Sequence, residues 1–289
     1  MLNFICNPKS GHSKASECAQ LLKQSLEAMD IPHEFHFTTS KQNTIDITRE
    51  ITSKGAENVI VIGGDGTLHD VLNGISDTSA VTLGLIPCGS GNDFASSAGI
   101  PLDPYKALGI ILNGKTRFVD YMECSGVRGI NVMGTGVDVD ILKRCYNSKV
   151  LKGKFKYAIA TLVSVFCYKY PHLTAIADGV KAERETFILS VANGKCFGCS
   201  IVIAPHADIS DGKLDYVLVN SMKWYHKPNA LIHLAAGKIL DIKQSEFTNV
   251  EHVEALFDKP TDIEIDGEIY HDLKFDVRVV HDRLKMFTK

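Results

Sequence analysis

Residues 58–67 read NVIVIGGDGT, a run of β-branched apolar residues followed by three glycines around one acid. The apolar run is typical of a fully buried strand, and the glycines predict a tight turn into a helix. In such a turn, backbone N–H groups and the positive end of the helix dipole can hold polyphosphate. Asp65 would repel a bare phosphate, so its presence favours a divalent cation between the carboxylate and the phosphate oxygens. The alternative is an ordinary strand-to-helix connection in which Thr67 caps the helix.

The residues around this stretch alternate short strand-like runs with longer amphipathic segments. This pattern is typical of parallel strands joined by helices, so residues 1–120 are predicted to form an α/β domain with an open, mostly parallel sheet. The expected strands cover residues 2–6, 33–38, 58–62 and 82–86, and the expected helices cover residues 14–28 and 42–54.

Two more polar turns follow strands of this sheet. Residues 86–95 read IPCGSGNDFA, and residues 7–11 read NPKSG. Because the carboxyl ends of parallel strands meet at one edge of a sheet, the three turns should lie together, where α/β folds bind ligands. Neither a P-loop nor a dinucleotide fingerprint is present, since Phe94 stands where the fingerprint requires its third glycine.

The remaining residues, 121–289, show closely spaced strand-like runs separated by turn signals, among them residues 187–192 and 273–280. They predict a mostly β domain that resembles a sandwich. Helical segments at about 154–168 and 225–240 interrupt the strands, and Trp224 is expected to pack at the start of the second helix.

The composition is that of an ordinary soluble globular protein. Of 289 residues, 45% are hydrophobic and 22% are charged, and the net charge of −3 argues against nucleic acid as a partner. No apolar run reaches the ~20 residues of a membrane-spanning helix. The polar turn close to the first Met leaves no room for a signal peptide, and the eight irregularly spaced cysteines do not suggest a disulfide framework. A cytoplasmic protein is expected.

Several motifs together resemble the diacylglycerol kinase catalytic domain of bacterial soluble lipid kinases. In the first half they are Asn7-Pro8 with Ser10-Gly11, GGDGT at 63–67, and P-x-G-S-x-N-D-F-A at 87–95. In the second half they are N-x-x-G-x-G-x-D at 131–138, Asn193-Gly194, A-P-x-A at 204–207, D-G-x-L at 211–214, and Asp266-Gly267-Glu268. The glycine-rich Asp65 motif is shared with NAD kinases and phosphofructokinases, whereas the turn at 89–94 combined with the late Asp-Gly-Glu is more specific.

The resemblance implies an ATP-dependent lipid kinase that uses Mg²⁺ and phosphorylates the hydroxyl of diacylglycerol or a related lipid. It implies a nucleotide site made of Asn7, Ser10, Gly11, Thr39, Gly63, Gly64, Gly66, Thr67, Gly89, Ser90 and Asn92. Ser90 stands where family members usually carry Thr, and it keeps the hydroxyl that can meet a phosphate.

Glu268 and Asp65 are the expected catalytic residues. Phosphoryl transfer depends on positioning and charge neutralisation, with a carboxylate that accepts the proton of the nucleophile. By resemblance Glu268 is this base and Asp65 organises the catalytic Mg²⁺. The alternative for Asp266-Gly267-Glu268 is a plain β-hairpin turn. His69 and Asp70, which follow the first glycine turn, are expected on the surface of the helix.

A second Mg²⁺ site is predicted at residues 208–213. By resemblance, Asp211 supplies a carboxylate there, and Asp208 and Lys213 supply backbone carbonyls, which are oxygen ligands that Mg²⁺ prefers. Asp120 is expected to reach the same hydrated network. The alternative is an Asp-Gly turn with solvated acids.

Seven Lys and Arg residues and no acid lie between residues 141 and 177. The basic segment 143–156 is therefore predicted to make peripheral contact with an anionic membrane leaflet. The alternative is a solvated helix face. Another alternative is that a second copy of the chain is a partner, in a homodimer.

Two other functions compete with the lipid kinase. One is an NAD kinase-like phosphotransferase acting on a soluble nucleotide, and the other is a non-catalytic lipid- or nucleotide-binding protein. The joint presence of Asp65, Asn92 and Glu268 speaks against the second, because a binding module needs no base.

Overall fold

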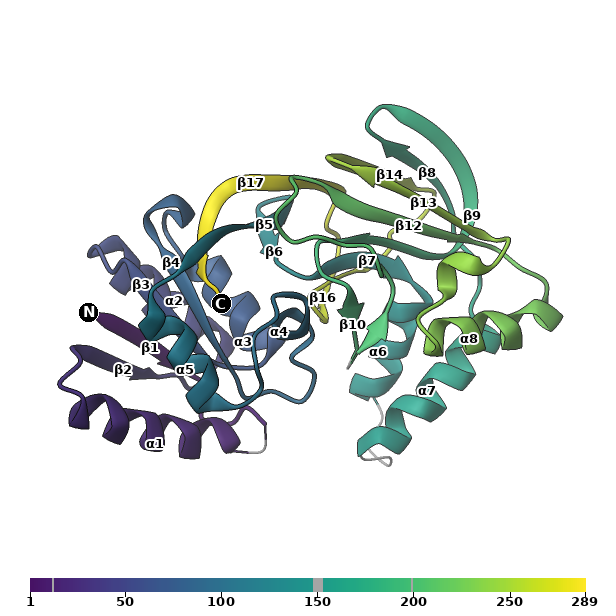
Figure 1. The fold of residues 1–289 in the computed structure, drawn as a ribbon. Coiled ribbons are helices and arrows are strands. Elements are labelled where there is room, and N and C mark those ends of the chain that lie inside the picture. The colour runs from purple at the N-terminus through teal and green to yellow at the C-terminus, as the bar shows by residue number, and fades with distance from the viewer. Residues whose placement is uncertain (12, 148–152, 199) are drawn as a thin grey trace.

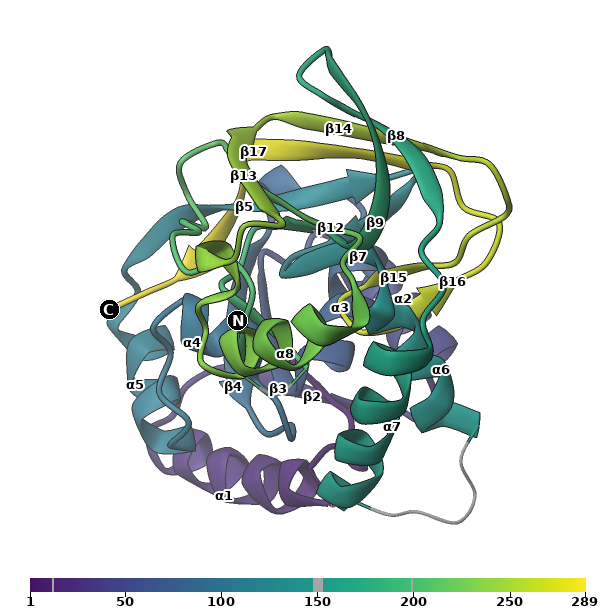
Figure 2. The same ribbon diagram turned by 90° about the vertical axis from the view of Figure 1, so that its right-hand side faces the viewer.

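The computed structural model describes residues 1–11, 13–147, 153–198 and 200–289. Figure 1 shows two lobes, with the N-terminal helices and strands in one and the later strands above three helices in the other. Figure 2 views the second lobe from its outer end. Among the described residues, no helix is both long and apolar enough to cross a bilayer.

The first lobe contains a parallel sheet in the order β4-β3-β1-β2. Its strands are β1 (Leu2–Cys6), β2 (His33–Phe37), β3 (Asn58–Gly63) and β4 (Thr82–Pro87). Its helices are α1 (Lys14–Ala28), α2 (Lys41–Ser53), α3 (Asp65–Gly74), α4 (Asp93–Ser97) and α5 (Pro104–Asn113), with a 3-10 turn η1 (Thr78–Ala80). The central strand β3 is buried from Val59 to Gly63, as its unbroken apolar run predicts.

The second lobe is mostly β with inserted helices. Its strands are β5 (Thr116–Cys124), β6 (Val127–Gly129), β7 (Val132–Gly136), β8 (His172–Ala177), β9 (Val180–Ala192), β10 (Cys196–Phe197), β11 (Ile201–Val202), β12 (Leu214–Asn220), β13 (Ser245–Val250), β14 (His252–Phe257), β15 (Ile263–Ile265), β16 (Glu268–Tyr270) and β17 (Phe275–Phe287). Its helices are α6 (Val137–Asn147), α7 (Gly153–Cys167) and α8 (Lys227–Ala235), with 3-10 turns η2 (Trp224–His226) and η3 (Ile239–Asp241). The expected fold class, an α/β domain followed by a mostly β domain, is confirmed.

The last strand, β17, joins the two lobes. It begins against β14, runs antiparallel to β5, and ends parallel to β4, where Lys285 lies opposite Thr82. Figure 1 shows it arching from one lobe to the other. Leu284, Met286 and Phe287 are consequently buried in the core of the first lobe. The division into residues 1–120 and 121–289 remains a prediction. The structure shows that the end of β17, from the second part, belongs to the sheet of the first lobe.

Several elements differ from their expected extent. The strand expected at 187–192 is part of the longer β9. The strand expected at 273–280 begins two residues too early and covers only the first part of β17, and the helix expected at 225–240 is divided into η2, α8 and η3. Pro228 near the start of α8 fixes where that helix begins. Trp224 lies before α8 as expected, but it is 74% exposed and contacts the ring of Tyr225 edge-on rather than packing into a core.

Candidate active site

Three loops meet at the carboxyl edge of the parallel sheet, after β1, β3 and β4. They approach so closely that a Cβ on Gly64 would lie 2.8 Å from the Cα of Gly89. Gly11 has a φ of +58°, and a Cβ there would overlap the carbonyl oxygen of Cys88. These glycines are therefore required by the packing of the loops on one another, in addition to any contact with a ligand.

The β15–β16 hairpin carries Glu268 toward these loops. At its turn Asp266 has a φ of 51° and Gly267 a φ of 86°, the backbone that favours Asp-Gly in a two-residue hairpin. Asp266-Gly267 therefore forms a hairpin turn, as the alternative interpretation states. The same turn also brings Glu268 to the site. A Cβ on Gly66, at the start of α3, would lie 3.9 Å from Oε1 of Glu268.

The buried carboxylate of Asp266 fixes this hairpin to both lobes. Its Oδ1 accepts hydrogen bonds from the backbone N–H groups of Asn131 (2.8 Å) and Val132 (3.2 Å). Its Oδ2 accepts one from the N–H of Ile130 (2.9 Å) and lies 3.0 Å from Nδ1 of His69.

The structure corrects the expectation that His69 and Asp70 lie on the helix surface, because both are buried, and His69 completely so. Nε2 of His69 lies 2.8 Å from the hydroxyl of Tyr270 on β16. A neutral ring with its proton on Nδ1 can donate to Asp266 and accept from Tyr270, so one side chain on α3 links the turn and the second strand of the hairpin. The hairpin and the glycine loop are thereby held in one relative position.

The loops and the hairpin enclose a cleft of about 520 Å³. Its lining includes Asp65 and Glu268 together with eight of the residues expected at the nucleotide site, namely Asn7, Ser10, Gly11, Gly64, Gly66, Thr67, Gly89 and Ser90. The hydroxyls of Ser10 and Thr67 are 3.2 Å apart, which ties the first loop to the start of α3.

Three residues expected at the nucleotide site lie outside this lining. Gly63 is the last residue of β3, and a Cβ on it would lie 2.6 Å from the side chain of Thr67. Asn92 closes its own loop, because its Oδ1 accepts from the N–H of Gly89 (2.8 Å) and its Nδ2 donates to the carbonyl of Gly89 (3.0 Å). Thr39 donates its hydroxyl to Asn43 at the start of α2 (3.2 Å).

Lys41 is a cleft residue that the sequence analysis missed. Its Nζ lies 3.2 Å from Oε2 of Glu268 and 3.9 Å from Oδ1 of Asp70. Partial burial lowers the pKa of Lys41, but Glu268, Tyr270 and Asp70 outweigh this and raise it overall. Burial raises the pKa of Asp70 to about 6, although Lys41 opposes the shift. Its place in the sequence could have identified Lys41, because it follows β2 at the same edge of the sheet.

A second, smaller pocket of about 180 Å³ adjoins the cleft and shares Asp65 and Gly91 with it. Its lining includes five acids, namely Asp65, Asp93, Asp138, Glu264 and Asp266. Burial raises the pKa of Asp138 to about 7 and raises that of Glu264 well above its usual range. Within the described residues, Oδ1 of Asp138 and Oε1 of Glu264 have no hydrogen-bond partner. The sequence analysis did not single out Glu264 or Asp93.

Asp65 and Asp93 have the donor atoms that Mg²⁺ prefers, and they lie close together. A Cβ on Gly91 would be 3.0 Å from Oδ2 of Asp65 and 3.3 Å from Oδ2 of Asp93. Burial raises the pKa of Asp65, with a smaller contribution from the charge of Asp93, and the N–H of Phe94 partly offsets this. Two close carboxylates in a partly buried site fit a divalent cation.

The loop expected to hold a second Mg²⁺ is cross-linked by its own side chains. Oδ1 of Asp208 accepts from Ser210, and Oδ1 of Asp211 accepts from the N–H of Lys213 (2.9 Å). The ammonium of Lys213 pairs with Glu251. Buried Asp120 accepts from the N–H of Gly212 (2.8 Å) and lies 2.6 Å from Nδ1 of His281. Asp120 thus reaches this loop, and the metal role stays a prediction.

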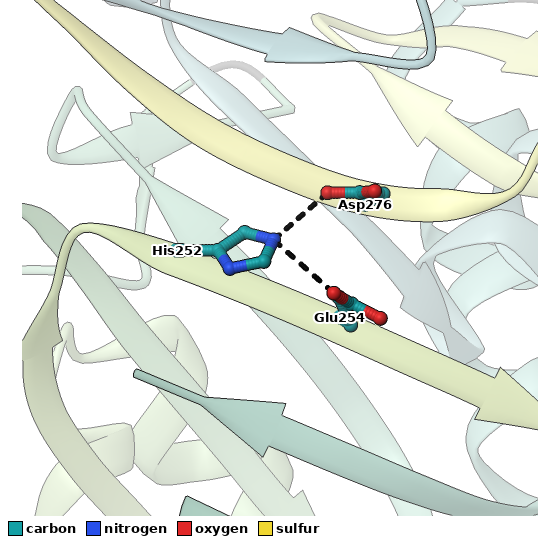
Figure 3. A group of neighbouring side chains, drawn as sticks. All are labelled: His252, Glu254 and Asp276. Carbon is teal, nitrogen blue, oxygen red and sulfur yellow. Dashed lines mark hydrogen bonds and ion pairs between the residues drawn. The ribbon is translucent and has the colours of Figure 1, made fainter. Parts of the chain in front are cut away.

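A third acidic group lies on the sheet surface, away from the predicted sites. Figure 3 shows His252 and Glu254 on β14 and Asp276 on the neighbouring β17. Nε2 of His252 is 2.8 Å from Oδ1 of Asp276 and 3.6 Å from Oε1 of Glu254. Lys274 lies within 3.9 Å of both carboxylates. Because an ammonium already pairs with these acids, the group is a surface ion-pair cluster.

The basic segment 143–156 is only partly described. Lys143 pairs with Asp262, and Arg144 pairs with Asp140 (2.8 Å). Lys149 and Lys152 lie outside the described residues, and no side chain is described for Lys154 and Lys156.

Comparisons with known proteins show the family to which the chain belongs. Residues 1–124 match the family model of the diacylglycerol kinase catalytic domain, and residues 131–288 match that of the YegS C-terminal NAD kinase beta sandwich-like domain. The diacylglycerol kinase of Bacillus subtilis is 24% identical over 271 residues, which covers 92% of this chain and 88% of that protein. A probable lipid kinase YegS-like of Chromohalobacter salexigens is 29% identical over 235 residues, covering 78% and 73%.

The fold is shared with solved structures. A crystal structure described as a putative diacylglycerol kinase from Bacillus anthracis str. Sterne superposes with a TM-score of 0.82 at 21% identity, covering 100% of this chain and 95% of that chain. The two family models together span almost the whole sequence. The chain therefore belongs to the diacylglycerol kinase-like family of lipid kinases.

Proposed function

We propose that this lipid kinase transfers the γ-phosphate of ATP to the hydroxyl of diacylglycerol or a related lipid. The observation that carries the proposal is that Asp65, from the first lobe, and Glu268, from the second, line the same cleft. A base and a metal-binding carboxylate on opposite sides of one cleft are what phosphoryl transfer to an alcohol requires.

The three loops would hold the phosphates of the nucleotide. The start of α3, Gly89 and Gly91 line the cleft, where the backbone donors and the dipole of a helix N-terminus favour an anion. Lys41 adds a positive charge between Glu268 and Asp70, where it can also pair with a phosphate.

Asp65 and Asp93 would hold a Mg²⁺ ion. When bound, the ion supplies positive charge that neutralises the phosphates during transfer. Glu268 would take the proton of the attacking hydroxyl. The contact between His69 and Asp266 would hold the hairpin that carries Glu268 in place. The carboxylate-rich pocket beside the cleft offers hydrogen-bond acceptors for the polar end of a lipid acceptor.

The test is an assay of the purified chain with labelled ATP, Mg²⁺ and, in separate reactions, diacylglycerol, a mixed lipid extract and NAD. We expect label in a lipid product and none in NAD. Glu268→Gln should lower turnover by about 10²-fold or more while ATP binding stays nearly unchanged, because a general base is typically worth that factor.

A matched control is Glu183→Gln, which removes the same charge from an exposed site on β9 that pairs only with Lys181 among the described residues. It should retain full turnover. Near-normal activity of the Glu268→Gln enzyme would remove Glu268 from the role of base, and label in NAD alone would replace the lipid by a soluble nucleotide.

A further inference from the structure

Helix α7 is apolar on two opposite faces. Ala160 and Val165 are buried in the core of the second lobe. Ile159, Leu162, Val163 and Phe166 are 38–53% exposed. Their spacing of three, four and seven residues places these four side chains on one face of the helix, opposite the buried one. An outward apolar stripe of this kind on a folded lobe indicates a surface that meets another apolar phase.

Two exposed aromatic residues adjoin the end of this stripe. Trp224 is 74% exposed and Tyr225 is 51% exposed, both on η2. The ammonium of Lys227, next to η2, donates to the carbonyl of Phe166 at 3.3 Å, so η2 lies beside the C-terminal end of α7. Figure 2 shows α7 and α8 next to each other at this end of the lobe. We call Ile159, Leu162, Val163, Phe166, Trp224 and Tyr225 the docking surface.

The charge around the docking surface is strongly polarised. Residues 141–177 and 216–240 together contain ten Lys and Arg and no acid, while the rest of the chain has a formal charge of −13. Lys169 and Lys223 are exposed at the edge of the docking surface. Apolar and aromatic side chains exposed on segments rich in Lys and Arg are the composition of an interface with anionic lipid.

We propose that the docking surface binds to the face of an anionic lipid bilayer, with the stripe of α7 inserted at the headgroup level. Trp and Tyr favour this level because their rings are apolar and carry one polar group. A two-fold contact between copies of this chain through the same face would place like cations opposite each other, which disfavours a homodimer here.

Docking at this surface would present the site to its lipid. Helix α6 packs against α7 in one core, where Ile141 meets Ala160 and Val165. Asp138 and Leu142, also on α6, line the carboxylate-rich pocket. The bilayer would therefore lie one helix away from the pocket, so the inference extends the proposed function by specifying where the lipid enters.

The single tryptophan allows a direct test on the unmodified full chain. Trp224 is the only Trp of the sequence, so its emission reports on the docking surface alone. With vesicles of equal parts phosphatidylglycerol and phosphatidylcholine, we expect a blue shift, quenching by brominated lipid, and sedimentation with the vesicles. Pure phosphatidylcholine vesicles, or high salt, should weaken each signal because they remove the electrostatic attraction.

The matched variants each replace two exposed apolar side chains, in different places. The double variant Leu162→Gln and Phe166→Gln should lower vesicle affinity at least tenfold, whereas Val180→Gln with Leu256→Gln, both exposed on strands, should change it less than twofold. Circular dichroism melting checks that each variant is folded. Equal losses in both pairs, or no emission shift with anionic vesicles, would overturn the proposal. A dimer in sedimentation velocity with Trp224 already shielded would overturn it in favour of a second copy.

Vesicle binding is measured without ATP. A chain that does not bind vesicles would therefore contradict the docking proposal without contradicting the kinase function. If both hold, the double variant should lose activity on diacylglycerol in vesicles but keep activity on a short-chain acceptor in free solution. Loss on both acceptors would contradict a docking role for α7.

Discussion

Replacing Asp266 by Asn tests whether the hairpin turn holds the two lobes in register. The wild-type carboxylate accepts three backbone hydrogen bonds and pairs with His69. An Asn keeps one oxygen facing Asn131 and Val132, but its NH₂ group then faces the N–H of Ile130. His69 can adapt by carrying its proton on Nε2, so the lasting loss is at Ile130.

The magnitude follows from these contacts. A hydrogen bond to a charged group contributes about 1.5–3 kcal/mol, so the bond from Ile130 is lost at that cost. The two remaining bonds lose their charge assistance, about 1 kcal/mol each, because charge-assisted bonds are roughly twice as strong as neutral ones. The free energy of unfolding should therefore fall by about 3.5–5 kcal/mol.

The assay is urea unfolding followed by circular dichroism, with ATP binding measured on the same samples. Asp272→Asn is the matched control, because Asp272 is exposed, also has a positive φ (57°), and should change stability by less than about 0.5 kcal/mol. If Asp266→Asn unfolds within about 1 kcal/mol of the wild type, the hydrogen bonds at Asp266 do not hold the hairpin as described.

Three further changes test the site. Gly64→Ala should lower ATP affinity at least about tenfold in calorimetry, because its Cβ would lie 2.8 Å from the Cα of Gly89 and force the loops apart; unchanged affinity would contradict the close loop packing. Lys41→Met should raise the pKa of Asp70 further above about 6, since the opposing cation is gone, and an unmoved carboxyl NMR titration would refute the contact. Asp138→Asn should stabilise the protein more at pH 8 than at pH 5. Burial raises the folded-state pKa of Asp138 to about 7, so its contribution to stability falls as the pH rises toward and past 7; urea unfolding at both pH values that showed no difference would exclude this.

Local sequence predicted the first lobe well, because the signals there are short-range. The buried run before Gly63 and the glycine turns around Asp65 and Gly89 follow from residues close together in the chain. Their meeting at one edge follows from parallel pairing alone. The long strands β9 and β17 were only partly predicted, since part of each is exposed and lacks a continuous apolar run.

The site was predicted in part for the same reason. Asp65 and Glu268 were found through motifs, but Lys41 and Glu264 belong to none. His69 was placed on a surface because its helix position gives no sign of the hairpin that covers it. Burial by an element some two hundred residues later cannot be read from local pattern.

By itself the sequence determined most strands and helices of the first lobe and the glycine turns, because these depend on neighbours in the chain, and it predicted Asp65 and Glu268 as acids of the site. Only the tertiary structure decided that β17 returns to the first sheet, that His69 and Asp266 join the lobes, and that α7 keeps an apolar face outward. Those features arise from contacts between distant residues, whose energies depend on how the whole chain packs.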